Sequence, residues 1–102
     1  MTALIEPYLP ALPALCRRFQ VKRLYLFGSA ASGGFRPEAS DLDFLVALDE
    51  SSPADYTENY FGLAQELERL FGRRVDLVTE RSVRNPYFRE VLEATRQLVY
   101  EG

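Results

Sequence analysis

Three aspartates in two apolar segments are the residues of this chain best suited to chemistry. Asp41 and Asp43 stand one residue apart at the start of the apolar run Leu42–Leu48, and Asp76 stands alone in the run VDLV. Side chains alternate along a strand, so Asp41 and Asp43 are expected on one face. If the two runs form neighbouring strands, the three carboxylates meet, and their repulsion favours a bound cation. Hard oxygen ligands suit Mg²⁺ or Mn²⁺, and a pair of such ions can clamp both oxygens of a phosphoryl displacement.

A glycine–serine pair at the end of an earlier apolar run, RLYLFGS, complements these carboxylates. Gly28 allows the backbone to approach a ligand closely. The Ser29 hydroxyl and the N–H groups that follow can receive phosphate oxygens, particularly if Ala30 to Ser32 form a helical turn. The loop from Ser32 to Asp41 is expected to bring this cradle back beside the carboxylates. We therefore predict a nucleoside triphosphate held by Gly28 and Ser29, with its phosphates on metal ions bound by the three aspartates.

Apolar periodicity predicts seven elements that position these residues. They are a helix over 8–19 with a proline-disturbed start, strands over 22–27 and 42–48, a helix from the Ser52 cap to Gly72, a strand over 74–79, a short helix over 87–94 and a strand over 97–100. This order predicts an α/β fold with a small mixed β-sheet packed against helices. Residues 1–102 are expected to form a single domain.

Composition excludes several classes of function. The chain has 102 residues, a net charge of −3 and no histidine. The absence of histidine removes Ser-His-Asp and Cys-His catalysis and the common zinc sites, and the acidic balance disfavours direct nucleic-acid binding. The single Cys16 is expected in the core of a cytoplasmic protein. Neither a signal peptide nor a membrane-spanning run is recognisable, so no membrane association is expected.

The Gly-Ser pair, the Asp-x-Asp that follows it and the later lone aspartate together resemble the DNA polymerase β-like nucleotidyltransferase superfamily. The segments RLYLFGS and GRRVDLVTERSVRNPYFRE are similar to its minimal nucleotidyltransferase (MNT) branch, from about Phe19 to Tyr100. This branch supplies the antitoxin of toxin–antitoxin modules, paired with an all-helical HEPN ribonuclease toxin.

The resemblance implies a polymerase β-like nucleotidyltransferase fold and transfer of AMP from ATP to a tyrosine of the toxin, within a hetero-oligomer. Gly28 and Ser29 would cradle the nucleotide. Asp41 and Asp43 would bind Mg²⁺ or Mn²⁺, and Asp76 would be the third metal ligand and the general base. The branch commonly reads Gly-Ser-Arg-Ala-Arg-Gly, whereas this chain reads GSAASG over residues 28–33. Both loop arginines, which would balance the triphosphate charge, are therefore absent, and Arg36 and Lys22 are the candidates to replace them.

Other interpretations of the same residues are open. The chain could be a non-catalytic antitoxin that neutralises its toxin by steric binding, or a nucleotidyltransferase acting on a small molecule such as an aminoglycoside. Asp76 could serve only an ion pair with Arg73 or Arg74. Two further groups each have two interpretations. The tyrosines Tyr56, Tyr60 and Tyr87 are either core residues or an exposed patch for a partner. The arginines Arg81, Arg84 and Arg89 either form a solvated face or contact a partner or ATP.

Overall fold

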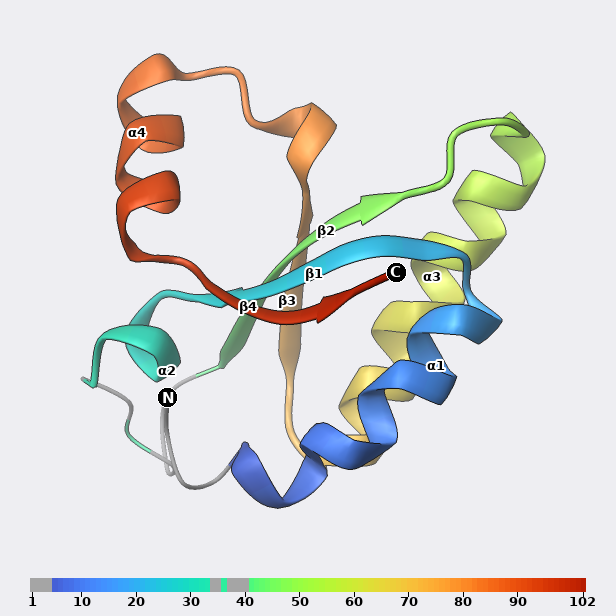
Figure 1. The fold of residues 1–102 in the computed structure, drawn as a ribbon, viewed down its shortest axis with the longest axis horizontal. Helices are drawn as coiled ribbons and strands as arrows, with labels where there is room; N and C mark the ends of the chain where they lie inside the picture. Colours follow the sequence, from blue (N-terminus) through green and yellow to red (C-terminus); the bar gives the residue numbers. More distant parts are fainter. Residues whose placement is uncertain (1–4, 34–35, 37–40) are drawn as a thin grey trace.

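The chain folds as a four-stranded sheet with helices on both faces (Figure 1). The computed structural model describes residues 5–33, 36 and 41–102. In chain order the elements are η1 (Glu6–Ala11), α1 (Leu12–Arg18), β1 (Val21–Phe27), α2 (Ser29–Ser32), β2 (Leu42–Leu48), α3 (Pro53–Phe71), β3 (Val75–Thr79), η2 (Glu80–Ser82), α4 (Pro86–Thr95) and β4 (Gln97–Glu101).

The sheet is mixed, as the sequence predicts. Its strand order is β3-β2-β1-β4. Strand β1 is antiparallel to both β2 and β4, whereas β2 and β3 run parallel and are joined by the crossover helix α3. The parallel pair places the starts of β2 and β3 at the same edge of the sheet, which is also the edge where β1 ends.

Local signals set the limits of the long crossover helix. The Ser52 hydroxyl accepts a hydrogen bond from the Asp55 amide at 3.4 Å, and Pro53 occupies the first turn. Gly72 ends α3 with a left-handed backbone (φ 66°), a conformation that costs glycine little. Both limits agree with the prediction from sequence.

The first helix differs from its prediction in one respect. In place of one disturbed helix over 8–19, the chain forms the 3₁₀ helix η1 followed by α1. Pro10 and Pro13 explain the division, because each lacks the N–H that a continuous α-helix beginning at Glu6 would use. The other predicted elements begin and end within about one residue of their predicted limits, as is usual for helix and strand ends, whereas η2 was not predicted.

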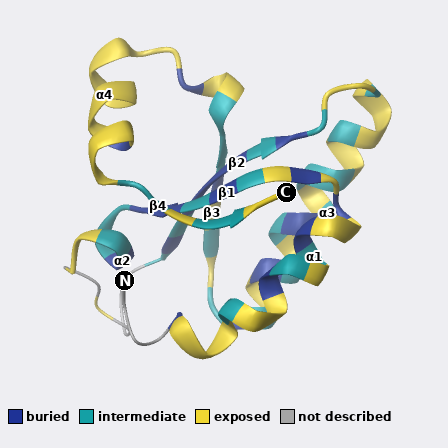
Figure 2. Cartoon of the chain, viewed as in Figure 1, coloured by how far each residue is buried: buried dark blue, intermediate teal, exposed yellow. Residues whose placement is uncertain are grey.

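Two apolar clusters lie on opposite faces of the sheet. The main core joins β1 and β2 to α1 and α3 and includes the fully buried Leu24, Phe44 and Leu63. A smaller cluster on the other face contains Leu45 of β2 and Leu92 of α4. Figure 2 shows the difference, because the central strands are rich in buried residues whereas α4 is exposed over nearly its whole surface. The second face of the sheet is therefore only partly covered.

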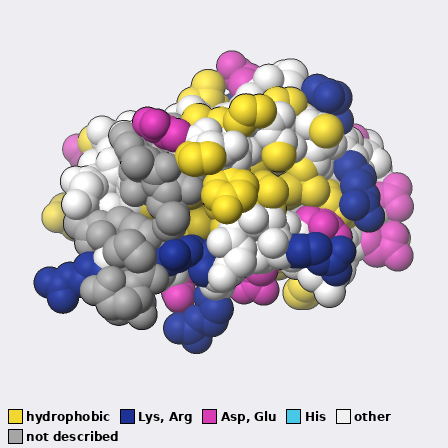
Figure 3. All heavy atoms as spheres, turned by 90° about the horizontal axis from the view of Figure 1, so that it is seen from below, with side chains coloured by type: hydrophobic (Ala, Val, Ile, Leu, Met, Phe, Trp, Pro, Cys, Tyr) yellow, Lys and Arg dark blue, Asp and Glu magenta, His cyan; other side chains and the backbone are white. Residues whose placement is uncertain are grey.

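The surface offers a further apolar region on the side of the first helices. Figure 3 shows hydrophobic side chains gathered near the middle of the face seen from below. Between α1 and α3, the side chains of Ala11, Leu15 and Leu70 line a shallow pocket of about 300 Å³. Among the helices that the structure describes, none is both long and apolar enough to cross a membrane.

Candidate active site

The predicted carboxylates lie at the edge of the sheet where β1 ends and β2 and β3 begin. Asp43 pairs with Phe27 of β1 on one side and with Asp76 of β3 on the other, so one row crosses three strands. Asp43 and Leu45 alternate with the core residue Phe44, which places Asp43 on the face opposite α1 and α3. The two apolar runs that carry the aspartates therefore do form neighbouring strands.

Gly28 lies directly against Asp43. It has φ 71° and ψ −151°, a backbone conformation that few residues other than glycine adopt. A Cβ atom placed on Gly28 would lie 2.2 Å from Asp43 Oδ2, closer than any real contact allows. A glycine is thus required here for two reasons, the backbone conformation and the space that the Asp43 carboxylate occupies.

Ser29 begins the short helical turn that the sequence predicts. The amides of Ala31 and Ser32 donate to Gly28 O at 3.1 and 3.0 Å, and Gly33 N donates to Ser29 O at 3.1 Å. The amides of Ser29 and Ala30, the first two residues of the turn, take no part in these bonds. The loop expected to return the chain to Asp41 falls largely on residues 34–35 and 37–40, which lie outside the described part.

A glutamine that the sequence analysis did not single out braces this turn. Gln97, the first residue of β4, donates from Nε2 to Ala31 O at 3.2 Å. Its Oε1 is buried and has no hydrogen-bond partner within the described residues. No sequence signal pointed to Gln97, because the contact joins residues 66 positions apart.

The pKa of Asp43 and the ion pair of Asp41 both reflect the negative charge crowded into this site. Burial raises the pKa of the Asp43 carboxyl, and the neighbouring carboxylates of Asp76 and Asp41 raise it further. Asp41 instead forms an ion pair with Arg74, whose Nε lies 3.3 Å from Asp41 Oδ1. Arg74, one of the two arginines considered as a partner of Asp76, thus pairs with Asp41.

The donor set suits a hard divalent cation, because it consists of carboxylate oxygens that repel one another. Within residues 5–33, 36 and 41–102, however, no three acidic, cysteine or histidine side chains are gathered as a ready set of metal ligands. Asp43 and Asp76 are adjacent, while Asp41 is held by Arg74. A cation bound by all three aspartates would have to compete with that guanidinium.

The structure bears on the absence of the two loop arginines from the Gly28-Ser29 cradle. Ala30, which stands where the family branch commonly has its first loop arginine, is 1% exposed and belongs to the main core. Ser32, at the position of the second, is exposed. Lys22 lies near the opposite end of β1 from Gly28, about 20 Å away at the rise of a strand, which removes it as a replacement.

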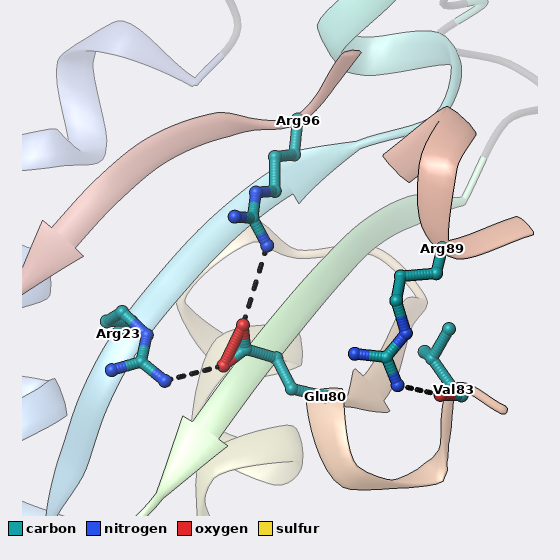
Figure 4. Close-up of polar contacts among 5 residues, drawn as sticks. All are labelled: Arg23, Glu80, Val83, Arg89 and Arg96. Atoms are coloured by element: carbon teal, nitrogen blue, oxygen red, sulfur yellow. Dashed lines mark hydrogen bonds and ion pairs between the residues drawn. The ribbon is translucent and has the colours of Figure 1, made fainter. Parts of the chain in front are cut away.

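A charged network that the sequence analysis missed lies on the same face of the sheet. Glu80 of η2 forms ion pairs with Arg23 of β1 at 2.9 Å and with Arg96, just before β4, at 3.5 Å (Figure 4). The guanidinium of Arg89 on α4 donates to Val83 O. These contacts fix η2, the segment that follows the strand carrying Asp76.

Comparison with known proteins identifies the fold. The nucleotidyltransferase domain family matches residues 11–99. A protein named as a protein adenylyltransferase in Methanocaldococcus jannaschii is 39% identical over 83 residues, covering 81% of this chain and 79% of its own. Protein adenylyltransferase MntA of Thermococcus cleftensis is 36% identical over 86 residues, covering 84% of this chain and 80% of its own.

Solved structures give the same result. A minimal nucleotidyltransferase superposes with a TM-score of 0.71 at 36% identity, covering 91% of this chain and 90% of its own. A toxin–antitoxin structure with AMP-PNP gives 0.69 at 25% identity, with coverage of 92% and 73%. An MNT antitoxin in complex with a tri-AMPylated HEPN toxin of Shewanella oneidensis gives 0.62 at 23%, with coverage of 95% and 72%, a likeness of fold alone. The predicted polymerase β-like fold and the resemblance are therefore confirmed: the chain belongs to the nucleotidyltransferase domain family, among the minimal nucleotidyltransferases related to MntA.

Proposed function

We propose that this protein is the antitoxin of a toxin–antitoxin pair and transfers AMP from ATP to a tyrosine of a cognate all-helical HEPN toxin, with which it forms a hetero-oligomer. The observation that carries the proposal is the position of Asp43, which pairs with Asp76 of β3 and lies against Gly28 at the end of β1. Relatives named protein adenylyltransferases and the toxin–antitoxin neighbour with AMP-PNP support the donor and the partner. The buried Cys16 thiol accords with a reducing cytoplasm.

Each part of the row has a role in the transfer. Gly28 and Ser29 hold the triphosphate through backbone amides and the serine hydroxyl, at the end of β1. Asp41 and Asp43 are the ligands for Mg²⁺ or Mn²⁺, and Asp76 is the third ligand. The bound metal ions would neutralise the charge that develops on the transferred phosphoryl group.

Asp76 also serves as the general base, because it is exposed on the outer strand, where an acceptor can approach it. The tyrosine hydroxyl gives its proton to this carboxylate and attacks the α-phosphorus, and pyrophosphate leaves from the side of the Gly28-Ser29 cradle. Attack and departure in line require the two groups to lie on opposite sides of the phosphorus. The strand order supports this arrangement, because β1 and β3 lie on either side of β2.

Exposed apolar side chains on α4 support the proposal of a protein partner. Tyr87 of α4 is 76% exposed, and Phe88 and Val91 of the same helix are also exposed. Figure 2 shows nearly all of α4 as exposed. Large exposed apolar side chains grouped on one element are typical of interaction surfaces. Of the three tyrosines considered from sequence, only Tyr87 is so exposed; Tyr56 and Tyr60 line a pocket instead.

The experiment that tests the proposal mixes this protein with the helical product of the adjacent gene, ATP and Mg²⁺, and records the intact mass of both chains. We expect a gain of one or more AMP masses on the partner, located on a tyrosine by peptide mapping. Asp43→Asn should abolish the gain, whereas Asp55→Asn, which changes an exposed aspartate on α3, should leave it unchanged. An unchanged partner mass with folded wild-type protein would refute the transfer.

The second candidate function is neutralisation of the toxin by steric binding without AMP transfer, which the absence of both loop arginines favours. It requires that an Asp41→Asn, Asp43→Asn double variant still protects cells from the toxin. Loss of protection while the complex still forms would eliminate it. Transfer to an aminoglycoside is the third candidate, and a gain of AMP mass on the drug without any partner would support it.

A further inference from the structure

A guanidinium stands among the three aspartates of the candidate active site. The parallel ladder of β2 and β3 continues one residue before β3, because Leu42 N donates to Arg74 O at 3.1 Å. Arg74 is therefore opposite Asp41, just as Asp76 is opposite Asp43. The Nε atom of Arg74 lies 3.3 Å from Asp41 Oδ1, so their side chains share one side of the sheet. Since side chains two residues apart on a strand point the same way, three carboxylates and one guanidinium form a two-by-two array.

The backbone of Arg74 is held in place, while its side chain is open to solvent. The Arg74 carbonyl is bonded to Leu42 N, and the next amide, Val75 N, donates to Glu68 Oε2 of α3 at 3.1 Å. The Arg74 side chain, in contrast, is 82% exposed, and that of its partner Asp41 is 43% exposed. An ion pair so open to water contributes little to stability. The guanidinium can therefore exchange its partner at small cost to the fold.

The Gly28-Ser29 cradle itself offers no cationic side chain to a triphosphate. The two positions where the family branch commonly carries arginines hold the buried Ala30 and the exposed Ser32. A triphosphate adds further negative charge beside the carboxylates, and a guanidinium can balance part of it through paired, charge-assisted hydrogen bonds. Arg74 brings such a group to the carboxylates from β3 instead of from the cradle.

The contact with Asp41 places the Arg74 guanidinium within reach of a phosphate that shares a metal ion with Asp41. Oxygen ligands lie about 2.1 Å from Mg²⁺, so two oxygens on the same ion are at most ~4 Å apart. Arg74 Nε is already 3.3 Å from Asp41 Oδ1. A change of side-chain rotamer, with the backbone held, is therefore enough to carry the guanidinium from the carboxylate to such a phosphate.

We propose that Arg74 is a nucleotide-binding residue, which pairs with Asp41 until Asp41 becomes a metal ligand and then pairs with the triphosphate of the bound nucleotide. This inference rests on the proposed AMP transfer and deepens it, because it names a residue that takes the place of the absent loop arginines. The exchange leaves both groups paired: Asp41 passes from the guanidinium to the cation, and the guanidinium passes from the carboxylate to a phosphate.

Removal of the Arg74 guanidinium should have two effects of opposite sign, and the first is on the affinity for a metal ion alone. Mn²⁺ is the probe, because electron paramagnetic resonance measures the free ion directly without nucleotide or partner. We expect Arg74→Ala to bind Mn²⁺ severalfold more tightly than the wild type, since the competitor for Asp41 is gone. Arg69→Ala is the matched control: Arg69 of α3 is 71% exposed and pairs with Glu66 at 3.3 Å. It removes the same charge and should leave the Mn²⁺ affinity unchanged.

The second effect is on the affinity for a nucleotide. The probe is α,β-methylene ATP with Mg²⁺, titrated by calorimetry; it cannot donate AMP, because carbon replaces the oxygen between the α- and β-phosphorus atoms. We expect Arg74→Ala to bind this probe about tenfold more weakly than the wild type, because a charge-assisted contact with the triphosphate is lost. Arg69→Ala should bind it like the wild type, and circular dichroism verifies that both variants are folded.

Tighter binding of Mn²⁺ together with weaker binding of the nucleotide in Arg74→Ala supports the inference. Nucleotide affinity that is unchanged or higher overturns it, and so does an unchanged Mn²⁺ affinity. Weaker binding of both probes also overturns it, since Arg74 would then only orient Asp41. The mass assay tests the transfer separately. If nucleotide binding depends on Arg74 but the mass of the partner does not change, the transfer is refuted and the role of Arg74 stands.

Discussion

At the residue scale, the close contact between Gly28 and Asp43 limits which residue can occupy position 28. Gly28→Ala adds a Cβ atom 2.2 Å from Asp43 Oδ2 in a left-handed backbone, so either the carboxylate or the turn must move. We expect AMP transfer to be lost and stability to fall by ~1–3 kcal/mol. Thermal unfolding and the mass assay measure both effects.

Gly33→Ala is the matched control for that substitution. Gly33 also has a positive φ, 92°, but a Cβ atom there meets nothing described within 4 Å. It should therefore show the backbone cost without the clash, and retain transfer. Equal loss of transfer in both variants would mean that backbone strain, not the contact with Asp43, limits the site.

Asp43 should also make stability depend on pH. Burial and the neighbouring carboxylates of Asp76 and Asp41 raise the pKa of Asp43 in the folded protein. The pKa of an aspartate in an unfolded chain is about 3.9. Below the pKa of the unfolded state, the protonated Asp43 contributes its full share of stability to the fold. As the pH rises through the higher pKa of the folded state, the carboxyl ionises and this stability is lost. Asp43→Asn should therefore melt at a higher temperature than the wild type at pH 7, and the difference should vanish below about pH 4.

The same variant reports on metal binding. Mg²⁺ that binds only the folded state raises its melting temperature. We expect this rise in the wild type and a smaller one in Asp43→Asn, measured without nucleotide at pH 7. An equal rise in the wild type and in Asp43→Asn would place the cation elsewhere. In the pH series, a difference in melting temperature that does not change with pH would contradict the argument that the Asp43 charge destabilises the fold.

Ser32 gives a way to restore charge to the cradle. It is exposed at the end of α2, at the position where the family branch commonly carries its second loop arginine. Ser32→Arg should lower the KM for ATP severalfold, and more at low salt, because a guanidinium there balances triphosphate charge. Gln65→Arg on the exposed side of α3 adds the same charge elsewhere and should leave the KM unchanged.

At the scale of elements, α2 depends on a strand that is distant in sequence. The Gln97 side chain of β4 holds Ala31 O, and α2 has only four residues to stabilise itself. Gln97→Ala should raise the KM for ATP severalfold with little change in kcat, because it loosens the cradle and leaves the carboxylates in place.

Amide hydrogen exchange provides the readout for that positioning role. Protection of the Ala31 and Ser32 amides should fall in Gln97→Ala, while β2 keeps its protection. Gln65→Ala, on α3, is the control and should alter neither quantity. Unchanged protection in α2 together with a raised KM would assign Gln97 a direct contact with the nucleotide.

At the scale of the whole molecule, one main core supports both the sheet and the site. Phe44 is fully buried and stacks on Phe71 with ring centres 5.8 Å apart. Phe44→Ala should lower the free energy of unfolding by ~3–5 kcal/mol, whereas Phe61→Ala, at a side chain 65% exposed, should change it by less than about 0.5 kcal/mol. If residues 1–102 form the single domain predicted, near- and far-UV circular dichroism should record one coincident transition in each variant. Separate transitions would indicate two folding units.

The sequence by itself determined the local features of this protein. Alternation of side chains along the strand predicted that Asp41 and Asp43 share one face, and the Ser52 cap and Gly72 predicted the limits of α3. These features depend on residues a few positions apart, and their backbone preferences act whatever surrounds them. The same holds for the glycine–serine turn.

Only the tertiary structure decided how these pieces meet. The pairing of Asp43 with Asp76 depends on the register of two strands joined by a crossover helix, which no local preference sets. The Arg74–Asp41 ion pair, the Gln97 contact and the pocket between α3, β3 and η2 likewise join side chains that are brought together by the fold. The sequence could therefore predict which residues are capable of the chemistry, whereas packing of the sheet against its helices determined which of them are neighbours.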